Sequence, residues 1–185
     1  MGTREDLLAG AKQCLAERGL ARTTVRDIVA ASGTNLAAIN YHFGTRDKLL
    51  NQAMLESTAE AVSHLLDTLP ADTELDSAGR LHSFWTKLLA SFGSDRTIWS
   101  ANVEALAHSL HSPEIRAEIG VAQQLARDGL SRDLGNDNPD VGMLLQSLIV
   151  GLLVQALVNP DHAPTAESIA SGIRALADLS TPAPH

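Results

Sequence analysis

The stretch from residue 23 to residue 50, TTVRDIVAASGTNLAAINYHFGTRDKLL, constrains the fold of this chain more than any other feature. Thr24 can cap a first helix, and Asp27, three residues on, can complete the cap reciprocally. Gly33 then ends that helix, because glycine readily takes the left-handed backbone of a tight turn. A second short helix follows over residues 36–43. This order of helix, turn and helix predicts a helix-turn-helix unit.

The helix predicted over residues 36–43 suits the major groove of DNA. Ile39 and Phe43 lie four residues apart, so both can face a core while the other faces stay available. The helix has small residues at its start and an amide, Asn40, one turn later. Small residues let a helix approach the base edges, and asparagine can pair with adenine.

The whole stretch resembles the DNA-binding domain of the TetR family of bacterial transcriptional regulators. The resemblance is free of gaps and covers residues 1 to about 50, including the end of the preceding helix at 14–19. Beyond residue 50 only the layout is similar. The matching positions are Thr24, Val25, Arg26, Ile28, Gly33, Ile39, His42, Phe43, Thr45, Arg46 and Leu49.

Four positions depart from the family pattern. Thr34 stands where a buried valine is usual, so its hydroxyl needs a hydrogen-bond partner. Asn40 and Ala37 replace a common tyrosine and glycine on the helix that would read DNA. The operator sequence therefore cannot be carried over from a relative. Arg46 replaces a lysine and keeps a positive charge for a phosphate.

Composition indicates an all-α protein. Apolar residues make up 44% of the chain, alanine and leucine dominate, and few segments alternate with period two. The resemblance implies about nine helices, arranged as a three-helix DNA-binding domain over residues 1–46 and a larger ligand-binding and dimerisation domain over residues 47–185. It also implies a homodimeric repressor that a small-molecule ligand releases from a palindromic operator.

Charge is unevenly distributed along the chain. The net charge is −8, but residues 1–48 hold seven Lys or Arg and five Asp or Glu, so this part is +2 and the rest is −10. A mildly basic domain on an acidic body fits a protein that touches DNA through one face. An excess this small can also arise by chance. A binding module for small molecules or proteins, with little DNA affinity, is therefore the alternative.

Other features of the sequence indicate the cellular location and the kinds of activity to expect. Cys14 is the only cysteine, so no internal disulfide can form, and the start of the chain has no signal-peptide pattern. We expect a cytoplasmic protein. No glycine-rich phosphate loop, nucleophile elbow or zinc-protease motif occurs, so we expect no enzyme activity. His108 and His111 could share a helix face, but nothing completes a metal site, and no cofactor is expected.

Apolar spacing and breakers predict the remaining helices. Ser112 followed by Pro113 and Glu114 is a strong helix start, because it combines a cap, a first-turn proline and a first-turn acid. Loops are expected at 70–77, 93–95 and 135–139, and the last five residues are expected to fray. The predicted helices span about 4–18, 45 or 46 to 69, 78–92, 97–110, 113–134, 140–158 and 165–179.

Residues 141–158, VGMLLQSLIVGLLVQALV, carry no charge over a length that could span a membrane. The polar residues within the segment and the lack of flanking Lys or Arg argue against a membrane span. A core helix within a monomer remains an alternative. The resemblance implies dimerisation through the last two helices. The residues expected at that interface are Ser147, Gly151, Gln155, Ile169 and Ile173.

Residues of the first domain can be assigned roles on DNA. Arg26 and Asn40 are expected at guanine and adenine edges, and Asn35 lies on an available face. Tyr41 and His42 could instead pack within the domain, and Arg26 could pair with an acid. Apolar base contacts are expected from Leu36, Ala37 and Ala38. Phosphate contacts are expected from Thr24, Tyr41, His42, Arg46 and Lys48.

The second domain gives weaker signals. A small-molecule site has mostly apolar walls with a few polar groups, and several side chains could line one between helices. Each of them, taken singly, is more often a core or surface residue than a ligand contact. The candidates for ligand contact are Trp85, Trp99, Asn102, His108, Met143 and Gln146. The effector itself cannot be named from these residues.

Overall fold

The computed structural model of the chain describes residues 2–68 and 76–180. These residues form nine α-helices and one short 3-10 helix and contain no strand, which confirms the predicted all-α fold. The predicted helix end at 69, most of the predicted loop at 70–77 and the tail at 181–185 lie outside them. The elements are α1 (Thr3–Arg18), α2 (Val25–Ser32), α3 (Leu36–Phe43), α4 (Arg46–Asp67), α5 (Ser77–Ser94), α6 (Arg96–Ser109), α7 (Pro113–Leu134), α8 (Pro139–Val158), η1 (Pro160–His162) and α9 (Ala166–Ser180).

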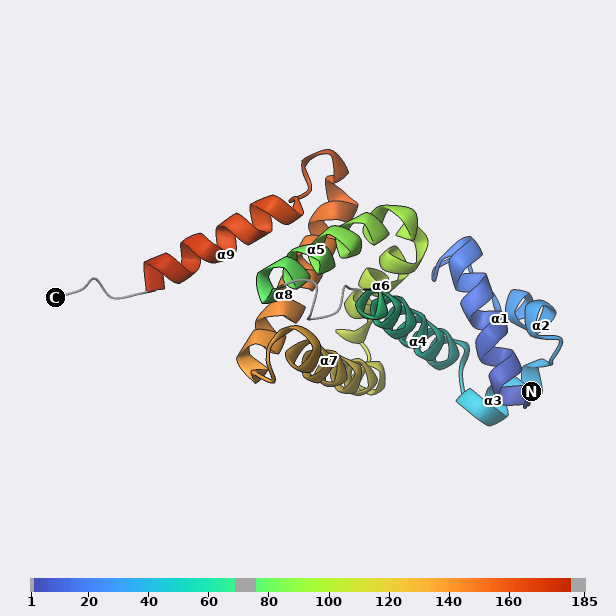
Figure 1. Cartoon of the computed structure of the whole chain (residues 1–185). Helices are drawn as coiled ribbons and strands as arrows, with labels where there is room; N and C mark the ends of the chain where they lie inside the picture. The colour runs from blue at the N-terminus through green and yellow to red at the C-terminus, as the bar shows by residue number, and fades with distance from the viewer. Residues whose placement is uncertain (1, 69–75, 181–185) are drawn as a thin grey trace.

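The helices form two groups joined by α4. Figure 1 shows α1–α3 together at one end of the molecule and α5–α8 packed into a larger unit, with α4 running between the two. α9 packs against α5, and its C-terminal end projects away from the rest. We call α1–α3 the head and α5–α9 the body.

Local sequence signals set the helix-turn-helix. Thr24 and Asp27 form the predicted capping box at the start of α2, and Gly33 ends that helix with φ 65° and ψ 21°. Asn35 caps α3 by accepting a hydrogen bond from the Ala38 amide at 3.0 Å. The Thr34 hydroxyl finds its partner in the Ser32 hydroxyl, 2.7 Å away. The helix cap at Thr24 and the helix end at Gly33 that the sequence predicts are therefore confirmed.

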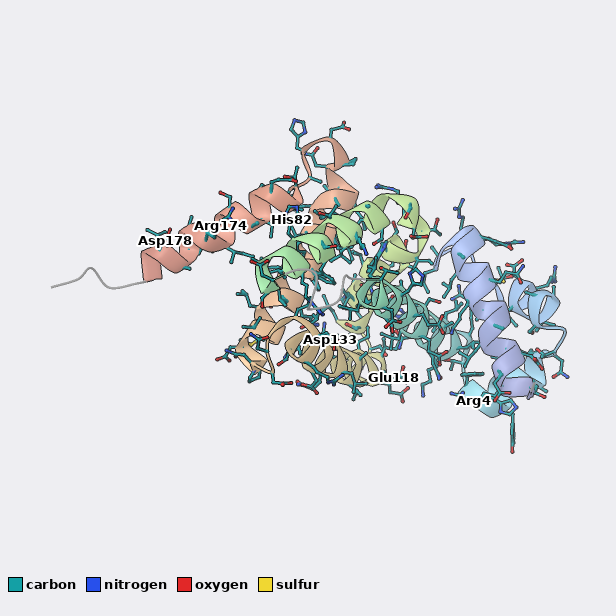
Figure 2. All side chains as sticks on the ribbon, viewed as in Figure 1. Arg4, His82, Glu118, Asp133, Arg174 and Asp178 are labelled. Atoms are coloured by element: carbon teal, nitrogen blue, oxygen red, sulfur yellow. The ribbon has the colours of Figure 1, made fainter. Side chains whose placement is uncertain are left out.

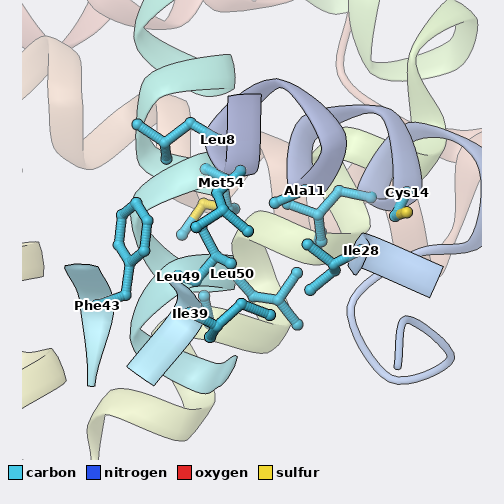
Figure 3. Close-up of a cluster of buried hydrophobic side chains, with 14 of the residues drawn as sticks. Leu8, Ala11, Cys14, Ile28, Ile39, Phe43, Leu49, Leu50 and Met54 are labelled. Atoms are coloured by element: carbon cyan, nitrogen blue, oxygen red, sulfur yellow. The ribbon is translucent and has the colours of Figure 1, made fainter. Parts of the chain in front are cut away.

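The head core depends on α4 and on the body. Ile28 from α2 and Ile39 from α3 are fully buried against Leu49 and Leu50, which belong to the first turns of α4 (Figure 3). The same buried cluster includes residues of α6 and α7: Ala101, Ala105, Ile115 and Ile119. The head therefore packs against the body through a continuous apolar contact. A domain border at residue 46 stays a prediction, because α4 serves both groups.

A second buried cluster holds the body together. Phe84, Trp85, Leu88 and Phe92 lie on one face of α5, at the spacing expected for a core helix. The Phe92 ring meets the Trp99 ring of α6 edge to face, with centroids 5.0 Å apart. Leucines of α7 and α8 complete the cluster: Leu130, Leu145, Leu152 and Leu153.

Two helix boundaries differ from the sequence prediction. α5 continues through Ser94, so the expected turn at 93–95 contracts to the single residue Asp95. The Asp95 amide donates to the Ser91 carbonyl and closes α5, while its carbonyl accepts from Ile98 and Trp99 and opens α6. One residue can therefore join two helices without a loop.

The close approach of α7 and α8 explains one glycine. A methyl group on Gly142 would overlap the carbonyl oxygen of Arg127 in α7, so only glycine fits there. The short connection between the two helices also uses positive φ at Asn136 and Asp137, residues that tolerate the left-handed region. α7 and α8 consequently form a tight antiparallel pair.

Candidate nucleic-acid interface

The outer face of α3 presents the side chains expected to meet DNA. Leu36 is 53% exposed and Tyr41 is 85% exposed. Ala37 and Asn40 are also exposed, whereas Ile39 and Phe43 are buried in the head core. A short helix with a fully buried side and a protruding outer face is available for contact with a groove.

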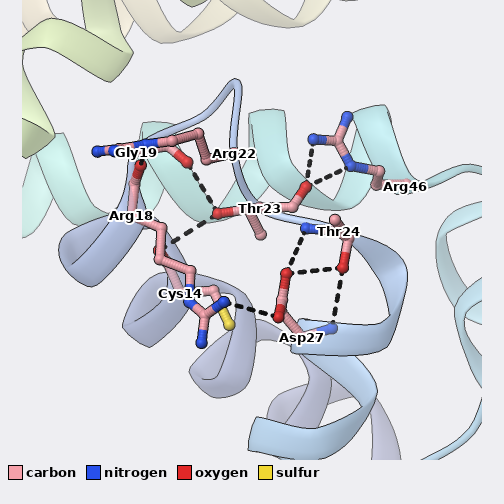
Figure 4. A network of polar contacts seen from close by, with 8 residues as sticks. All are labelled: Cys14, Arg18, Gly19, Arg22, Thr23, Thr24, Asp27 and Arg46. Carbon is pink, nitrogen blue, oxygen red and sulfur yellow. Dashed lines mark hydrogen bonds and ion pairs between the residues drawn. The ribbon is translucent and has the colours of Figure 1, made fainter.

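Polar contacts hold α2 in place beneath this face. The Asp27 carboxylate accepts from the Thr24 amide at 2.9 Å and from the Thr24 hydroxyl at 2.6 Å. Arg18 of α1 donates to the same carboxylate at 2.8 Å (Figure 4). The hydrogen bonds from Thr24, assisted by the charge of Arg18, lower the pKa of Asp27. Thr24 is therefore committed to the cap, although its exposed position still allows a phosphate contact.

Arg46 has several hydrogen-bond partners within the chain. Its guanidinium donates to the Thr23 carbonyl through Nε at 2.8 Å and again through Nη2 (Figure 4). Nη2 also donates to the Leu20 carbonyl at 3.1 Å. Nη1 contacts the neighbouring Asp47 carboxylate at 2.6 Å. This geometry favours a positioning role, which ties the start of α4 to the α1–α2 connection, over the predicted phosphate contact.

Lys48 faces the body. Its Nζ lies 2.7 Å from the Glu114 carboxylate of α7, and this pairing raises the pKa of Lys48. One turn further along α4, Asn51 donates to the Glu118 carboxylate at 2.7 Å. The structure therefore gives Lys48 a link between α4 and α7, where the sequence suggested a phosphate contact.

The remaining basic and aromatic groups lie around α3. Arg26 is exposed, and the half-buried His42 ring stands edge to face with Tyr41 at 4.9 Å between centroids. Arg4, which the sequence analysis missed, lies with its guanidinium 5.2 Å from the centre of the Phe43 ring, next to α3 (Figure 2). No local sequence pattern predicts this contact, because it joins side chains of two different helices, α1 and α3.

The residues expected to bind a ligand do not form one pocket. Trp99 is 2% exposed in the body core, and Met143 is 49% exposed on the surface of α8. Asn102 donates to the Thr58 hydroxyl at 3.3 Å, and Gln146 accepts from Arg127 at 2.7 Å. The other two, Trp85 and His108, line separate cavities. The six residues face different neighbours, and their contact with a ligand stays a prediction.

Two of the cavities lined by described residues include candidate ligand residues. One, of about 250 Å³, lies at the junction of head and body, where residues of the α1–α2 connection, α4, α6 and α7 meet, and His108 is part of its wall. The other, of about 360 Å³, lies between α5 and α9 and includes Trp85. The described residues contain no group of three His, Cys, Asp or Glu that could hold a metal ion.

The residues predicted for the dimer interface divide into two sets. Ser147, Gly151 and Gln155 are exposed on α8. Ile169 and Ile173 instead pack toward the body core of their own chain, and Ile169 is only 9% exposed. α5 covers part of the apolar face of α9, while Leu176 and Leu179 further along α9 are exposed, so a place for Ile169 and Ile173 at a dimer interface stays a prediction.

α8 keeps an apolar surface. Within the described residues it is the one helix, Pro139–Val158, that is long and apolar enough to cross a membrane, and 28% of its most apolar window is buried. Leu144, Val154 and Val158 are exposed along it. These three side chains are part of the exposed surface of α8.

The geometry defines a helix-turn-helix protein whose recognition helix protrudes from a head fixed to a helical body. Residues 7–53 match the model of the bacterial regulatory proteins of the tetR family. Residues 77–180 match the C-terminal part of BetI-type transcriptional repressors. The chain belongs to the TetR family of bacterial regulatory proteins, as the stretch at 23–50 predicted.

Named relatives are transcription regulators. The probable HTH-type transcriptional regulator ArpR of Pseudomonas putida is 30% identical over 124 residues, which cover 67% of this chain and 58% of that protein. The regulator TtgR of Pseudomonas putida is 29% identical over the same shares of each chain. The chain thus matches 58% of the length of these curated relatives.

Solved structures share the fold over nearly the whole chain. The multidrug binding protein EbrR, in complex with proflavin, aligns with a TM-score of 0.71 and 22% identity over 95% of this chain and 99% of that chain. A transcriptional regulator from Rhodococcus sp. Rha1 aligns with a TM-score of 0.70 and 21% identity over 99% of this chain and 100% of that chain. At these identities the likeness establishes the fold.

The free energies of unfolding of two variants can distinguish the role of Arg46 from that of Lys48. Arg46→Ala removes charged hydrogen bonds to two carbonyls, so we expect the free energy of unfolding to fall by about 1.5–3 kcal/mol. Lys48→Ala removes one exposed ion pair and should change it little. Urea denaturation of both variants measures the difference. The opposite result, an unchanged stability with a DNA affinity less sensitive to salt by about one unit of slope, would assign Arg46 to a phosphate.

Proposed function

We propose that this chain is a sequence-specific DNA-binding repressor that acts as a homodimer on a roughly palindromic operator and is released by a small-molecule effector. The observation that carries the proposal is the exposed face of α3 on a head whose position is fixed by buried contacts with α4, α6 and α7. A regulator of this kind works on cytoplasmic DNA. The proposal follows the names of the relatives, all of which are regulators or repressors.

Direct readout is assigned to α3 and to the start of α2. Asn40 lies on the exposed face one turn from the helix start, where its amide can pair with adenine, and Arg26 can reach guanine from α2. Leu36, Ala37 and the half-buried Ala38 supply apolar contact. Phosphates are left to the groups around this face: Thr24, Asn35, Tyr41, His42 and the added Arg4.

Dimerisation is assigned to α8. Its exposed positions repeat at alternating intervals of three and four residues, the spacing of a helix seam that packs against another helix. Nothing described lies within 4 Å of a methyl group placed on Gly151, so a second helix can approach closely there. The seam consists of Leu144, Ser147, Gly151, Val154 and Val158. A second copy of the chain, related by two-fold symmetry, is the occupant we propose.

A dimer makes DNA binding by a short recognition helix sequence-specific, because two such helices then read the DNA together. Two heads held by one body can read two half-sites about one turn of DNA, ~34–36 Å, apart. Any movement of the body that changes the distance between the heads prevents both α3 helices from seating at once. Effector binding can therefore release DNA without a change at the α3 surface. EbrR, a protein of the same fold, was crystallised with proflavin, and we extend small-molecule binding from it to this chain as part of the proposal.

A second candidate function is a binding module with little DNA affinity. The net charge of −8 favours it, since phosphate contacts need basic groups. Arg46 and Lys48, two of the seven basic residues at 1–48, also have partners within the chain. Selection of DNA by the purified protein separates the two functions.

Selection of genomic fragments tests the DNA-binding proposal. We expect the purified protein at near-physiological salt to enrich a palindromic site, and Asn40→Ala to lose the preference at one position of each half-site, at a cost of about 1–3 kcal/mol. Gln124→Ala, which removes an exposed amide side chain from α7 in the body, serves as the control. A folded, dimeric protein that enriches no site would favour the module without DNA affinity.

The dimer seam can be tested by one buried charge. Val154→Asp places a carboxylate in the proposed apolar seam, so we expect a monomer at micromolar concentration and a loss of operator binding. Leu110→Asp is the matched control, because Leu110 is 68% exposed at the end of α6, away from α8. Sedimentation equilibrium measures both variants. A dimer that survives Val154→Asp would place the interface elsewhere.

A further inference from the structure

The cavity of about 250 Å³ at the junction of head and body has an apolar lining from three parts of the chain. Leu20 and Ala21 come from the α1–α2 connection, Ala105 from α6 and Ile115 from α7. None of the described residues in its wall belongs to α3 or α8. The cavity is therefore separate from the outer face of α3 and from the proposed dimer seam.

The polar groups that α4 adds to this wall already have partners within the chain. Arg46 donates to two backbone carbonyls and pairs with the Asp47 carboxylate at 2.6 Å. Asn51 donates to the Glu118 carboxylate of α7 at 2.7 Å. The charges of Arg46 and Asp47 compensate each other, so α4 contributes no net charge to the cavity.

α6 adds one carboxylate to the wall, that of Glu104. Within residues 2–68 and 76–180 no hydrogen bond or ion pair engages this carboxylate. Glu104 is an exposed residue, so a molecule that enters the cavity from solvent can reach its side chain. With histidine counted as neutral, the described wall has one positive side chain, Arg46, and two negative ones, Asp47 and Glu104. The unmatched charge of the cavity is therefore that of Glu104.

An organic cation matches this wall better than a metal ion or an anion does. The described residues contain no group of three His, Cys, Asp or Glu that could hold a metal ion. The guanidinium of Arg46 cannot turn toward an anion without losing its carbonyl partners. A protonated primary amine, in contrast, has three N–H donors, and its charge-assisted hydrogen bonds to a carboxylate are stronger than neutral ones.

We propose that the junction cavity binds a small primary ammonium compound, whose nitrogen pairs with Glu104 and whose apolar part lies against Leu20, Ala21 and Ile115. The cavity volume is below the range of about 300–1,000 Å³ that is usual for drug-sized ligands, so the compound is small. This ligand site is additional to the proposed DNA binding and does not depend on it. Because the compound contacts the α1–α2 connection and α6 together, its binding stabilises the orientation of the head on the body.

Three probes with the same number of carbons test the proposal on the unmodified protein: hexylammonium, hexanol and hexanoate. At pH 7 the amine is protonated, as a lysine side chain is. We expect hexylammonium to shift the backbone signals of Ala21 and Ala105 in an assigned ¹⁵N–¹H correlation spectrum, and to bind more tightly than the alcohol and the carboxylate. Ala170 and Ile173 line the α5–α9 cavity and provide the control for location, since their signals should stay in place.

Two variants isolate the contribution of the carboxylate. Glu104→Gln removes the charge and keeps the size of the side chain, so we expect the dissociation constant of hexylammonium to rise by about fivefold, the upper end for an exposed ion pair. The dissociation constant of hexanol should not change. Asp178→Asn is the matched control, because it removes an equal charge from an exposed residue near the projecting end of α9 (Figure 2).

Three results would overturn the proposal. Hexylammonium could leave the signals of Ala21 and Ala105 in place, hexanol or hexanoate could bind as tightly as hexylammonium, or Glu104→Gln could bind hexylammonium as tightly as Asp178→Asn does. The first two comparisons use the unmodified chain, so they decide the matter even if a variant fails to fold. None of these measurements involves DNA, so a failure of the ligand site is distinct from a failure of the repressor function.

Discussion

The insertion of the first turns of α4 into the head is the contact on which the rest of the structure depends. Leu49 and Leu50 are fully buried among residues of α1, α2 and α3, so the head has no complete core without them. Arg46 fixes the same turns by donating to the carbonyls of Thr23 and Leu20. Lys12 of α1 adds ion pairs to Glu56 and Glu60 further along α4. The orientation of α3 is therefore set by the helix that also leads into the body.

Coupling between head and body follows from this arrangement. α4 is linked to α7 by the Lys48–Glu114 ion pair and by the hydrogen bond from Asn51 to Glu118, while α6 and α7 contribute apolar residues to the head cluster. The head cannot turn without disturbing these contacts. A body that changes shape on binding an effector would transmit the change through α4, α6 and α7, and two heads in one dimer would move apart or together. The Lys48–Glu114 ion pair is exposed enough to be exchanged at little cost, whereas Asn51 is buried and, with the apolar contacts, keeps the head attached.

The parts of the structure that depend on local chemistry were predictable from the sequence, and those that depend on the choice of neighbour were not. The caps at Thr24 and Ser112 and the left-handed Gly33 follow from residues within one turn, and the structure contains them. The partners of Arg46 lie 23 and 26 residues away, so no local pattern contains them. Ile169 shows the same limit, since its spacing marks an apolar helix face without indicating whether α5 or a second chain covers it. The neighbours of the candidate ligand residues could not be predicted for the same reason.

The central claim is that the proposed dimer holds its two α3 helices at a fixed distance. The helical phase of the two half-sites on DNA tests this claim most directly. The protein would be titrated by fluorescence anisotropy against its selected operator and against a variant with about half a helical turn, ~5 base pairs, inserted between the half-sites. A rigid dimer cannot place both α3 helices on the same side of the lengthened site, so the account predicts that affinity falls to the level of non-specific DNA. Equal affinity for the two sites would contradict it, because the heads would then bind independently.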